Sequence, residues 1–298
     1  MRTFDDLLSR AKNLPRKRIA LIAPASDETF IAIREALNTL PVHFLLAGDP
    51  SAIRNKLVEG SSVTLLPAGS IPEAVLCCLQ AVRNGEADIL MKGSVDTGSM
   101  MKAAVDEADG IRTGRLMSDV FICEYPPANR FLMITDGGLT IAPTLRDKVD
   151  LIHNAATVAH ALGNMNPRVA VLSASEMVNP SMQSSIDAAA LAKMNERGQI
   201  KGCVVDGPFA LDNAIDPAAA REKGITSPVA GNADILLLPT IEAANALAKS
   251  TTYFAGYRLA HVVVGARVPI LIPSRADKSD AKLLSMALGM IMSEHRES

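Results

Sequence analysis

The chain has 298 residues, of which 48% are hydrophobic and 21% are charged, a balance typical of a well-packed soluble protein. It is about twice as long as a chain that a single core serves comfortably, so two lobes are expected. The net charge of −2, the absence of Trp and the presence of only three Tyr argue against a general attraction to polyanions and against base-stacking platforms, so we expect no nucleic-acid partner.

The chain begins with a segment that carries Asp5 and Asp6 where a secretory signal needs an apolar run. No later segment has the uncharged length that a membrane span requires. We therefore expect a cytoplasmic protein with no membrane partner. The four cysteines stand in apolar surroundings without C-x-x-C spacing, which favours buried thiols over disulfides or a zinc site.

Short apolar runs alternate with longer segments of helical period, which is typical of parallel strands joined by crossover helices. The runs predict strands over residues 19–23, 42–47, 87–91, 131–134, 169–173, 202–205, 235–238 and 268–272. Helices are predicted around residues 27–37, 72–83, 144–162, 182–197, 242–251 and 277–293. The predicted fold class is α/β, with predominantly parallel sheets flanked by helices.

A turn-rich passage separates two series of strand-helix units. It follows Asp136-Gly137-Gly138 and ends at Pro143. We expect an N-terminal α/β lobe over residues 1–140 and a second α/β lobe over residues 141–272. The C-terminal helix, within residues 273–298, is expected to pack back on the first lobe, and the active cleft is expected between the lobes.

The first candidate binding segment follows the predicted strand at residues 87–91. It contains Lys92, Thr97 and several small residues, which let backbone amides approach an anion at the carboxyl end of a parallel strand. The P-loop order is missing because Lys92 precedes the glycines. Lys92 and Thr97 are therefore candidate phosphate ligands, and a capped turn with Lys92 in solvent is the alternative.

The second candidate segment places Arg112 and Arg115 around a glycine. If this segment is a loop, both guanidinium groups could reach one phosphate, whereas on an exposed helix they would be solvated. Two acids also follow predicted strands, Asp136 before Gly137-Gly138 and Asp206 before Gly207-Pro208. Both are candidates to line the cleft, although turn chemistry alone also selects Asp beside Gly.

The most informative stretch is near the end of the chain, where a predicted strand leads through Ser274, Arg275 and Asp277 into the last helix. A hydroxyl, a guanidinium and carboxylates gathered where a strand gives way to a helix can hold a phosphate and a reacting carbonyl.

Several motifs together resemble one family. In order along residues 86–290, the runs are MKGSVDTGSM, GIRTGR, ITDGGLTIAP, ALAKMNERGQIKGCVVDGPFALDNAI, SPVAGNADILLLP, KSTTYFAG and SRAD. They are similar to the phosphate acetyltransferase and phosphate butyryltransferase family, most closely to its butyryl branch. The resemblance implies direct transfer of a short acyl group between coenzyme A and inorganic phosphate in a ternary complex. Coenzyme A and its thioester would be substrates, with no bound cofactor and no metal.

The resemblance also implies roles for residues near the end of the chain. Ser274 and Arg275 match the family's Ser-Arg pair, so Ser274 would donate to the developing oxyanion and Arg275 would hold phosphate. A downstream carboxylate would act as base toward the thiol, and both Asp277 and Asp280 are available. We favour Asp280. The family resemblance further implies a two-lobed architecture like that of isocitrate and isopropylmalate dehydrogenases. We also expect a homodimer or higher homo-oligomer.

The segment at residues 239–249 resembles a family stretch that reads P-D-x-x-x-G-N-x-x-Y-K. Glu242, Asn245 and Lys249 are candidate substrate-binding residues on one helical face, and a solvated face is the alternative. This chain departs from the stretch at Thr240, Ala244 and Ala248, and these departures would reshape the cleft.

Two other classes of function stay open at this point. A dehydrogenase is disfavoured because no G-x-G-x-x-G follows the first strand, where residues 23–27 read APASD. A catalytically silent acyl-CoA-binding protein is disfavoured because Ser274 and Arg275 are both present. The acyl group also stays open, with acetyl as the alternative to butyryl, because one methylene changes binding by only about 1 to 3 kcal/mol.

Overall fold

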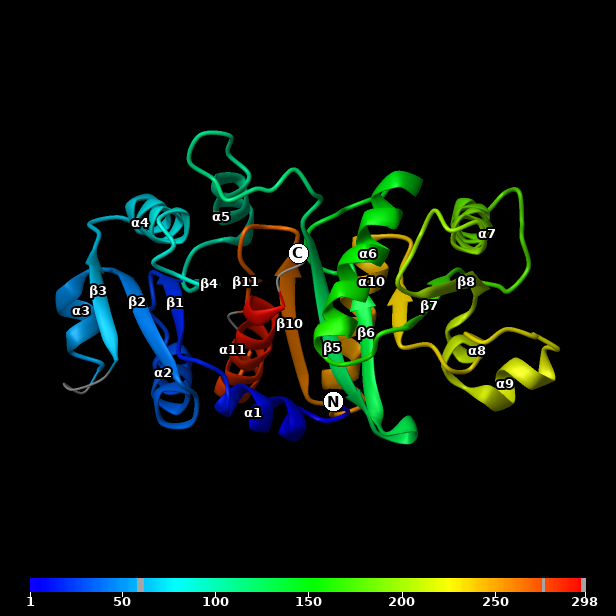
Figure 1. The fold of residues 1–298 in the computed structure, drawn as a ribbon, viewed down its shortest axis with the longest axis horizontal. Coiled ribbons are helices and arrows are strands. Elements are labelled where there is room, and N and C mark those ends of the chain that lie inside the picture. Colours follow the sequence, from blue (N-terminus) through cyan, green and yellow to red (C-terminus); the bar gives the residue numbers. More distant parts are fainter. Residues whose placement is uncertain (58–61, 275–276, 296–298) are drawn as a thin grey trace. The chain divides into compact units, whose positions relative to one another are not determined.

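The computed structural model describes residues 1–57, 62–274 and 277–295 (Figure 1). The chain forms two compact units. The terminal unit consists of Phe4–Arg115 and Ala260–Ser298, and the central unit consists of Met1–Thr3 and Leu116–Leu259. The compact units change over at residues 115–116 and 259–260, while the lobe boundary near residue 140 stays a prediction.

The terminal unit contains a mostly parallel sheet. Its strands follow the order β3-β2-β1-β4-β11-β10, and only β10 runs antiparallel to its neighbour β11. The strands are β1 (Lys17–Ile22), β2 (Val42–Gly48), β3 (Val63–Pro67), β4 (Ile89–Lys92), β10 (Leu259–Val264) and β11 (Ile270–Leu271). The helices are α1 (Phe4–Lys12), α2 (Asp27–Thr39), α3 (Pro50–Arg54), α4 (Ile71–Arg83), α5 (Thr97–Ala104) and α11 (Ser279–Glu294). In Figure 1 the red α11 lies beside the blue α1, and it also packs against α2.

The central unit contains strands in the order β5-β6-β9-β7-β8. β5 and β6 are antiparallel, whereas β6, β9, β7 and β8 are parallel. The strands are β5 (Ser118–Tyr125), β6 (Arg130–Thr135), β7 (Arg168–Leu172), β8 (Val204–Phe209) and β9 (Ile235–Leu237), with the short 3-10 helix η1 (Pro126–Ala128) between β5 and β6. The helices are α6 (Leu145–Ala161), α7 (Gln183–Glu196), α8 (Leu211–Ile215), α9 (Pro217–Glu222) and α10 (Ile241–Tyr253).

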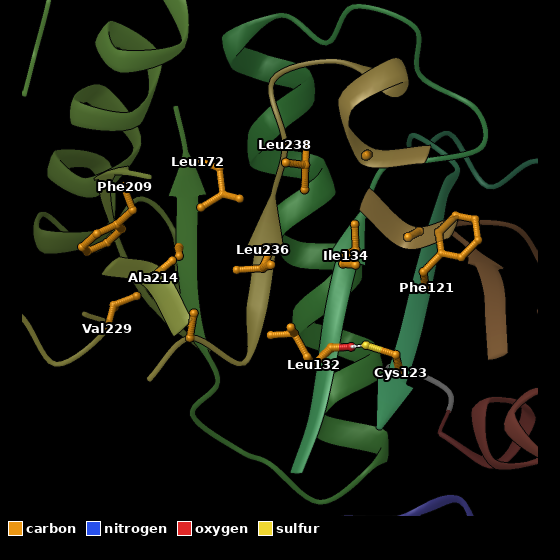
Figure 2. Packing of buried hydrophobic residues seen from close by; sticks show 14 of the residues in the cluster. Phe121, Cys123, Leu132, Ile134, Leu172, Phe209, Ala214, Val229, Leu236 and Leu238 are labelled. Carbon is orange, nitrogen blue, oxygen red and sulfur yellow. Dashed lines mark hydrogen bonds between the residues drawn. The ribbon is translucent and has the colours of Figure 1, made fainter. Parts of the chain in front are cut away.

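The core of the central unit is built from aliphatic side chains and few aromatic rings. Figure 2 shows Leu132 and Ile134 from β6 packed beside Leu236 from β9, with Leu172 and Phe209 further along the same cluster. These five side chains are at most 5% exposed. The aromatic-poor composition is therefore sufficient for a buried core, because the strands supply continuous aliphatic surfaces.

In each unit, an Arg-Asp ion pair joins the amino ends of two parallel strands. In the terminal unit, Arg18 on β1 donates from Nε and Nη2 to Asp88, directly before β4, at 3.0 and 2.8 Å. In the central unit, Arg168 on β7 makes the same two contacts with Asp234, directly before β9, at 3.0 and 2.9 Å. Arg130 on β6 adds a further contact to Asp234 at 3.0 Å.

The predicted α/β class is confirmed, and each predicted strand and helix has a counterpart in the structure. The structure adds elements that the sequence patterns did not predict, namely α1, α3, β3, α5, β5, α8, α9 and β10. Within the described part of the chain, no helix combines the length and the apolar composition needed to cross a membrane.

Candidate active site

Several predicted site residues lie at the carboxyl edge of the terminal unit's sheet. The neighbouring strands β1, β4 and β11 are parallel, with Ile22 opposite Lys92 and Leu271 opposite Met91. Because the carboxyl ends of parallel strands share one edge, the segments that follow these strands emerge together. Lys92 ends β4, and Ser274 follows β11 by three residues. The structure therefore brings the two segments to the same edge.

Lys92 is buried rather than solvated. The side chain is 5% exposed, and its ammonium group lies 3.3 Å from the carbonyl oxygen of Val95. The next residue, Gly93, allows this turn to approach β1, because a Cβ there would stand 2.1 Å from the carbonyl oxygen of Ile22. Half-buried Thr97 begins α5 after the turn. The turn is therefore packed against the neighbouring strand, and the ammonium group is held inside it.

Ser274 and Asp277 are joined by two hydrogen bonds. The Ser274 amide donates to Asp277 Oδ2 at 2.7 Å, and the Asp277 amide donates to the Ser274 carbonyl at 3.2 Å. The Asp277 carboxylate is thus engaged with the backbone of the turn. Arg275, the predicted phosphate ligand, lies outside the described residues.

Asp280 occupies the first turn of α11 and is exposed. Its Oδ1 accepts a hydrogen bond from the Ala281 amide at 2.7 Å. The preceding amide, that of Ser279, donates to Glu28 on α2 at 3.0 Å. Acidic groups thus surround the start of α11, where the helix dipole favours negative charge.

Lys282 is a residue that the sequence analysis did not single out. Its side chain is 3% exposed, and its ammonium group donates to the carbonyl oxygen of Asp277. Burial lowers the pKa of Lys282 from its ordinary value, while the charges of Asp277, Glu28 and Asp280 oppose that shift. A lysine amid the apolar residues of the last helix was the available signal, although lysine on a helix is usually exposed.

Arg112 lies beside a different part of the sheet, and Arg115 follows it by three residues. Arg112 forms an antiparallel bridge with Ala266 in the β10–β11 turn, and Thr113 Oγ1 donates to the Gly265 carbonyl at 2.7 Å. Both arginines are exposed, and Arg112 Nη2 lies 2.7 Å from Glu107. The β10–β11 turn precedes β11 whereas Ser274 follows it, so the segments join opposite ends of that short strand.

In the central unit, Asp136 organises the loop that follows β6. Its carboxylate accepts hydrogen bonds at 3.0 to 3.1 Å from the amides of Asp119, Gly138, Leu139 and Thr140. The residue is 2% exposed. Burial and the neighbouring Asp119 charge raise its pKa above the ordinary value, and the backbone donors oppose them. All of these polar contacts are made with the chain itself.

Asn245 is brought to the same loop, because its Nδ2 donates to the Gly137 carbonyl at 2.8 Å. The other helix candidates, Glu242 and Lys249, are exposed on α10. A hydrogen bond from the Thr240 side chain lowers the pKa of Glu242. Asp206 is half-buried on β8, and its Oδ1 accepts from the Gly207 amide at 2.8 Å.

Across residues 1–57, 62–274 and 277–295, no three His, Cys, Asp or Glu side chains are grouped in a way that could hold a metal ion. The four cysteines are free, and burial raises the pKa of the Cys78 and Cys123 thiols to about 12.

Comparison with known proteins connects this arrangement to one family. Residues 68–290 match the family described as "Phosphate acetyl/butaryl transferase". The chain belongs to this phosphate acetyl/butyryl transferase family. The match covers every predicted site residue, from Lys92 to Asp280, and the resemblance inferred from the sequence is confirmed.

Individual members of the phosphate acetyl/butyryl transferase family match almost the whole chain. A phosphate butyryltransferase of Clostridium beijerinckii is 45% identical over 296 residues, which cover 98% of each chain. A phosphate acetyltransferase of Thermotoga maritima is 43% identical over 283 residues, which cover 92% of this chain and 95% of the relative. The crystal structure of a branched-chain phosphotransacylase from Enterococcus faecalis has a TM-score of 0.84 at 28% identity, covering 94% of this chain and 100% of that one.

These relatives of the phosphate acetyl/butyryl transferase family differ in the acyl group that their names give. The butyryl and acetyl relatives differ by only two percentage points in identity to this chain. Overall identity therefore supports the acyltransferase class that these relatives share. The acyl group is identified by experiment.

Proposed function

We propose that this chain catalyses the reversible reaction acyl-CoA + phosphate = acyl phosphate + CoA, with butyryl or another short-chain acyl group. The observation that carries the proposal is the placement of Ser274 at the carboxyl edge of β11, within a chain that matches the family over residues 68–290. Acetyl transfer is the alternative, and the acetyltransferase of Thermotoga maritima at 43% identity supports it.

The proposed chemistry is direct transfer between the two substrates. In the direction of acyl-CoA formation, the Asp280 carboxylate takes the proton of the CoA thiol, and the thiolate attacks the carbonyl carbon of the acyl phosphate. The bond between the carbonyl carbon and the phosphate oxygen then breaks, and phosphate leaves with the electron pair. The Ser274 hydroxyl would donate to the oxyanion that forms on the carbonyl oxygen.

The contacts of the two candidate acids support Asp280 as the base. Each carboxylate accepts one backbone amide at 2.7 Å, but Asp277 is half-buried in the turn whereas Asp280 is exposed at the start of α11. A carboxylate that takes a proton from an incoming substrate needs an accessible oxygen. Asp277 is better suited to hold the turn.

Phosphate would be held by Arg275, with Lys92, Thr97, Arg112 and Arg115 as further candidates. Since a guanidinium group can contact phosphate through two parallel hydrogen bonds, replacing Arg275 by Ala should weaken the apparent affinity for phosphate more than that for the thioester. Steady-state kinetics with each substrate varied in turn would measure this difference. Equal weakening toward both substrates would argue against a phosphate-specific role.

In the central unit, Asp136 and Asn245 would shape a substrate-facing loop, and Asp206, Glu242 and Lys249 would contribute polar groups. The buried contacts of Asp136 support an indirect role, through the loop's backbone. We also propose a cytoplasmic homodimer that needs no bound cofactor or metal and binds no nucleic acid. Size-exclusion chromatography with light scattering would measure the oligomeric state.

The proposed function is tested by measuring free thiol released from acetyl-, propionyl-, butyryl- and isobutyryl-CoA, with and without inorganic phosphate. We expect release that requires phosphate and is fastest with the four-carbon thioesters. Fastest release from acetyl-CoA would select the acetyl alternative. If phosphate had no effect on release from any of the four thioesters, the proposed reaction would be wrong.

A further inference from the structure

The start of α11 buries a lysine that the proposed reaction does not use. Lys282 is 3% exposed, and its neighbours on the helix include the buried Leu284 and Ser285. A buried ammonium group is costly unless it is paired and hydrogen-bonded. Its position in the first turns of a helix adds to the cost, because the helix dipole disfavours a cation there. A lysine at this position therefore does not stabilise α11 by itself.

The contacts of Lys282 identify what compensates this cost. Its ammonium group donates to the Asp277 carbonyl, and the charges of Asp277, Glu28 and Asp280 act on it. Glu28 is itself placed by the Ser279 amide, which donates to it at 3.0 Å. The ammonium group is therefore held by the Asp277 carbonyl, and the negative charges of Asp277, Glu28 and Asp280 favour its charged form.

Asp277, which Lys282 contacts, is in turn hydrogen-bonded to the backbone of Ser274. Asp277 Oδ2 accepts the Ser274 amide at 2.7 Å, and the Asp277 amide returns a bond to the Ser274 carbonyl at 3.2 Å. We propose that Lys282 is a positioning residue, which holds Asp277 and through it fixes the backbone of Ser274. This inference rests on the proposed function, because it assigns a purpose to the fixed position of the Ser274 hydroxyl.

The change Lys282→Met tests the inference, because Met retains an unbranched side chain of similar length and removes the charge and the donor. A catalytic hydroxyl displaced by about 1 Å can cost on the order of 100-fold in rate. We expect kcat to fall by about 10- to 100-fold, with the KM for the thioester changed by less than about threefold. Lys282→Arg, which keeps the charge, should retain more activity than Lys282→Met.

Lys278→Met is the matched control. Lys278 stands on the same turn and is exposed, so its replacement removes one positive charge near the site without removing the bond to Asp277. We expect kcat and KM to stay within about twofold of the unchanged protein. A similar loss in both lysine variants would mean that only net positive charge matters, and it would overturn the positioning role.

A double-mutant cycle with Asp277→Ala tests whether Lys282 acts through Asp277. Asp277→Ala removes the 2.7 Å link from the carboxylate to the Ser274 amide and keeps the 3.2 Å backbone bond, so Lys282→Met should lower kcat less in this background than it does alone. Multiplication of the two separate losses in the double variant would contradict the inference. If Lys282→Met does not fold, the same cycle is run with Lys282→Leu, which also removes the charge and the donor, and an unchanged kcat in that variant would contradict the inference.

Hydrogen exchange separates this inference from the proposed function. In the full-length chain without substrates, exchange in the peptide that contains Ser274 and Asp277 should be at least tenfold faster in Lys282→Met than in Lys278→Met. Faster exchange in a chain that shows no acyl transfer would support the positioning role and count against the proposed reaction. Equal exchange in the two variants, with transfer intact in the unchanged protein, would overturn the positioning role alone.

Discussion

Replacing Asp234 by Ala should destabilise the chain without changing its chemistry. The Asp234 carboxylate accepts from the Arg168 amide at 2.9 Å, from the Arg168 guanidinium at 3.0 and 2.9 Å and from Arg130 at 3.0 Å. Its side chain is 9% exposed, and that of Arg130 is 15% exposed. The substitution therefore leaves one largely buried guanidinium group and one half-buried guanidinium group without their carboxylate.

The burial of these groups determines how much stability Asp234→Ala should lose. Removing one partner of a buried ion pair costs about 3 to 5 kcal/mol. The Arg168 side chain keeps 34% of its surface exposed, so water compensates part of the loss, and we expect about 3 kcal/mol. The matched variant is Asp88→Ala. Within the described part of the chain, the one arginine that contacts Asp88 is Arg18, whose side chain is 42% exposed. We expect about 1 kcal/mol there.

Urea unfolding at pH 7 would give the free energy of unfolding for both variants, and steady-state kinetics at 25 °C would give kcat and KM. Asp234 lies before the amino end of β9, whereas the proposed site follows the carboxyl ends of other strands, so both kinetic constants should stay within about twofold of the unchanged protein. Equal losses of stability in the two variants, or a loss below about 1 kcal/mol for Asp234→Ala, would refute the reasoning from burial.

The same variant has an expected pH dependence. Although burial opposes the effect, the hydrogen bonds and charges of Arg168 and Arg130 lower the pKa of Asp234 in the folded chain. An Asp with a lowered pKa stabilises the fold while it is ionised, and this contribution is lost as the pH falls from about 3.9 through the folded-state value. The stability difference between the unchanged protein and Asp234→Ala should be constant above about pH 5 and shrink below pH 4. A difference that grew on acidification would contradict this sign.

Further substitutions test the catalytic hydroxyl, the loop after β6 and the core of the central unit. Ser274→Ala should lower turnover by about 100-fold and leave CoA affinity, measured by calorimetry, within about twofold, and an unchanged rate would remove Ser274 from the mechanism. Gly138→Ala would place a Cβ 2.4 Å from Oδ2 of the buried Asp119, and thermal unfolding should show a loss of about 1 to 3 kcal/mol in the free energy of unfolding. Gly98→Ala is its control, because the added Cβ meets only a carboxylate oxygen at 3.4 Å. There the loss should be less than about 0.5 kcal/mol. Phe209→Ala should cost about 3 to 5 kcal/mol in urea unfolding because the ring is 1% exposed, and a loss below 1 kcal/mol would contradict its place in the core.

The parallel strands could be predicted because their apolar runs are continuous. β1, β4 and β9 are buried along most of their lengths, so each appears in the sequence as an uninterrupted hydrophobic segment. β3 lacks this signal because its residues are only partly buried or exposed. β5 carries Asp119 and Glu124 within its bounds, and these acids interrupt the pattern that marks a buried strand.

The turn before α11 is a candidate site because of the types of residue that follow a strand, and its contacts could not be predicted from the sequence. Lys282 stands amid apolar residues of the last helix, which is a weak signal, and Glu28, whose charge acts on it, stands more than 250 residues earlier in the chain on α2, against which α11 packs. For Asp136, the sequence pattern fits two different roles. An Asp before two glycines fits both a ligand-facing acid and a turn, and only the four amide contacts reveal that its carboxylate organises the loop.

The ratio of acyl phosphate formed to CoA released shows whether the acyl group is transferred to phosphate. Butyryl-CoA and inorganic phosphate would be incubated with the protein, free thiol would be titrated, and acyl phosphate would be followed by phosphorus NMR in the same sample. We expect one acyl phosphate for each CoA, with both products reduced by about 100-fold in Ser274→Ala. Release of CoA with free butyrate and no acyl phosphate would show hydrolysis instead of transfer and would contradict the account.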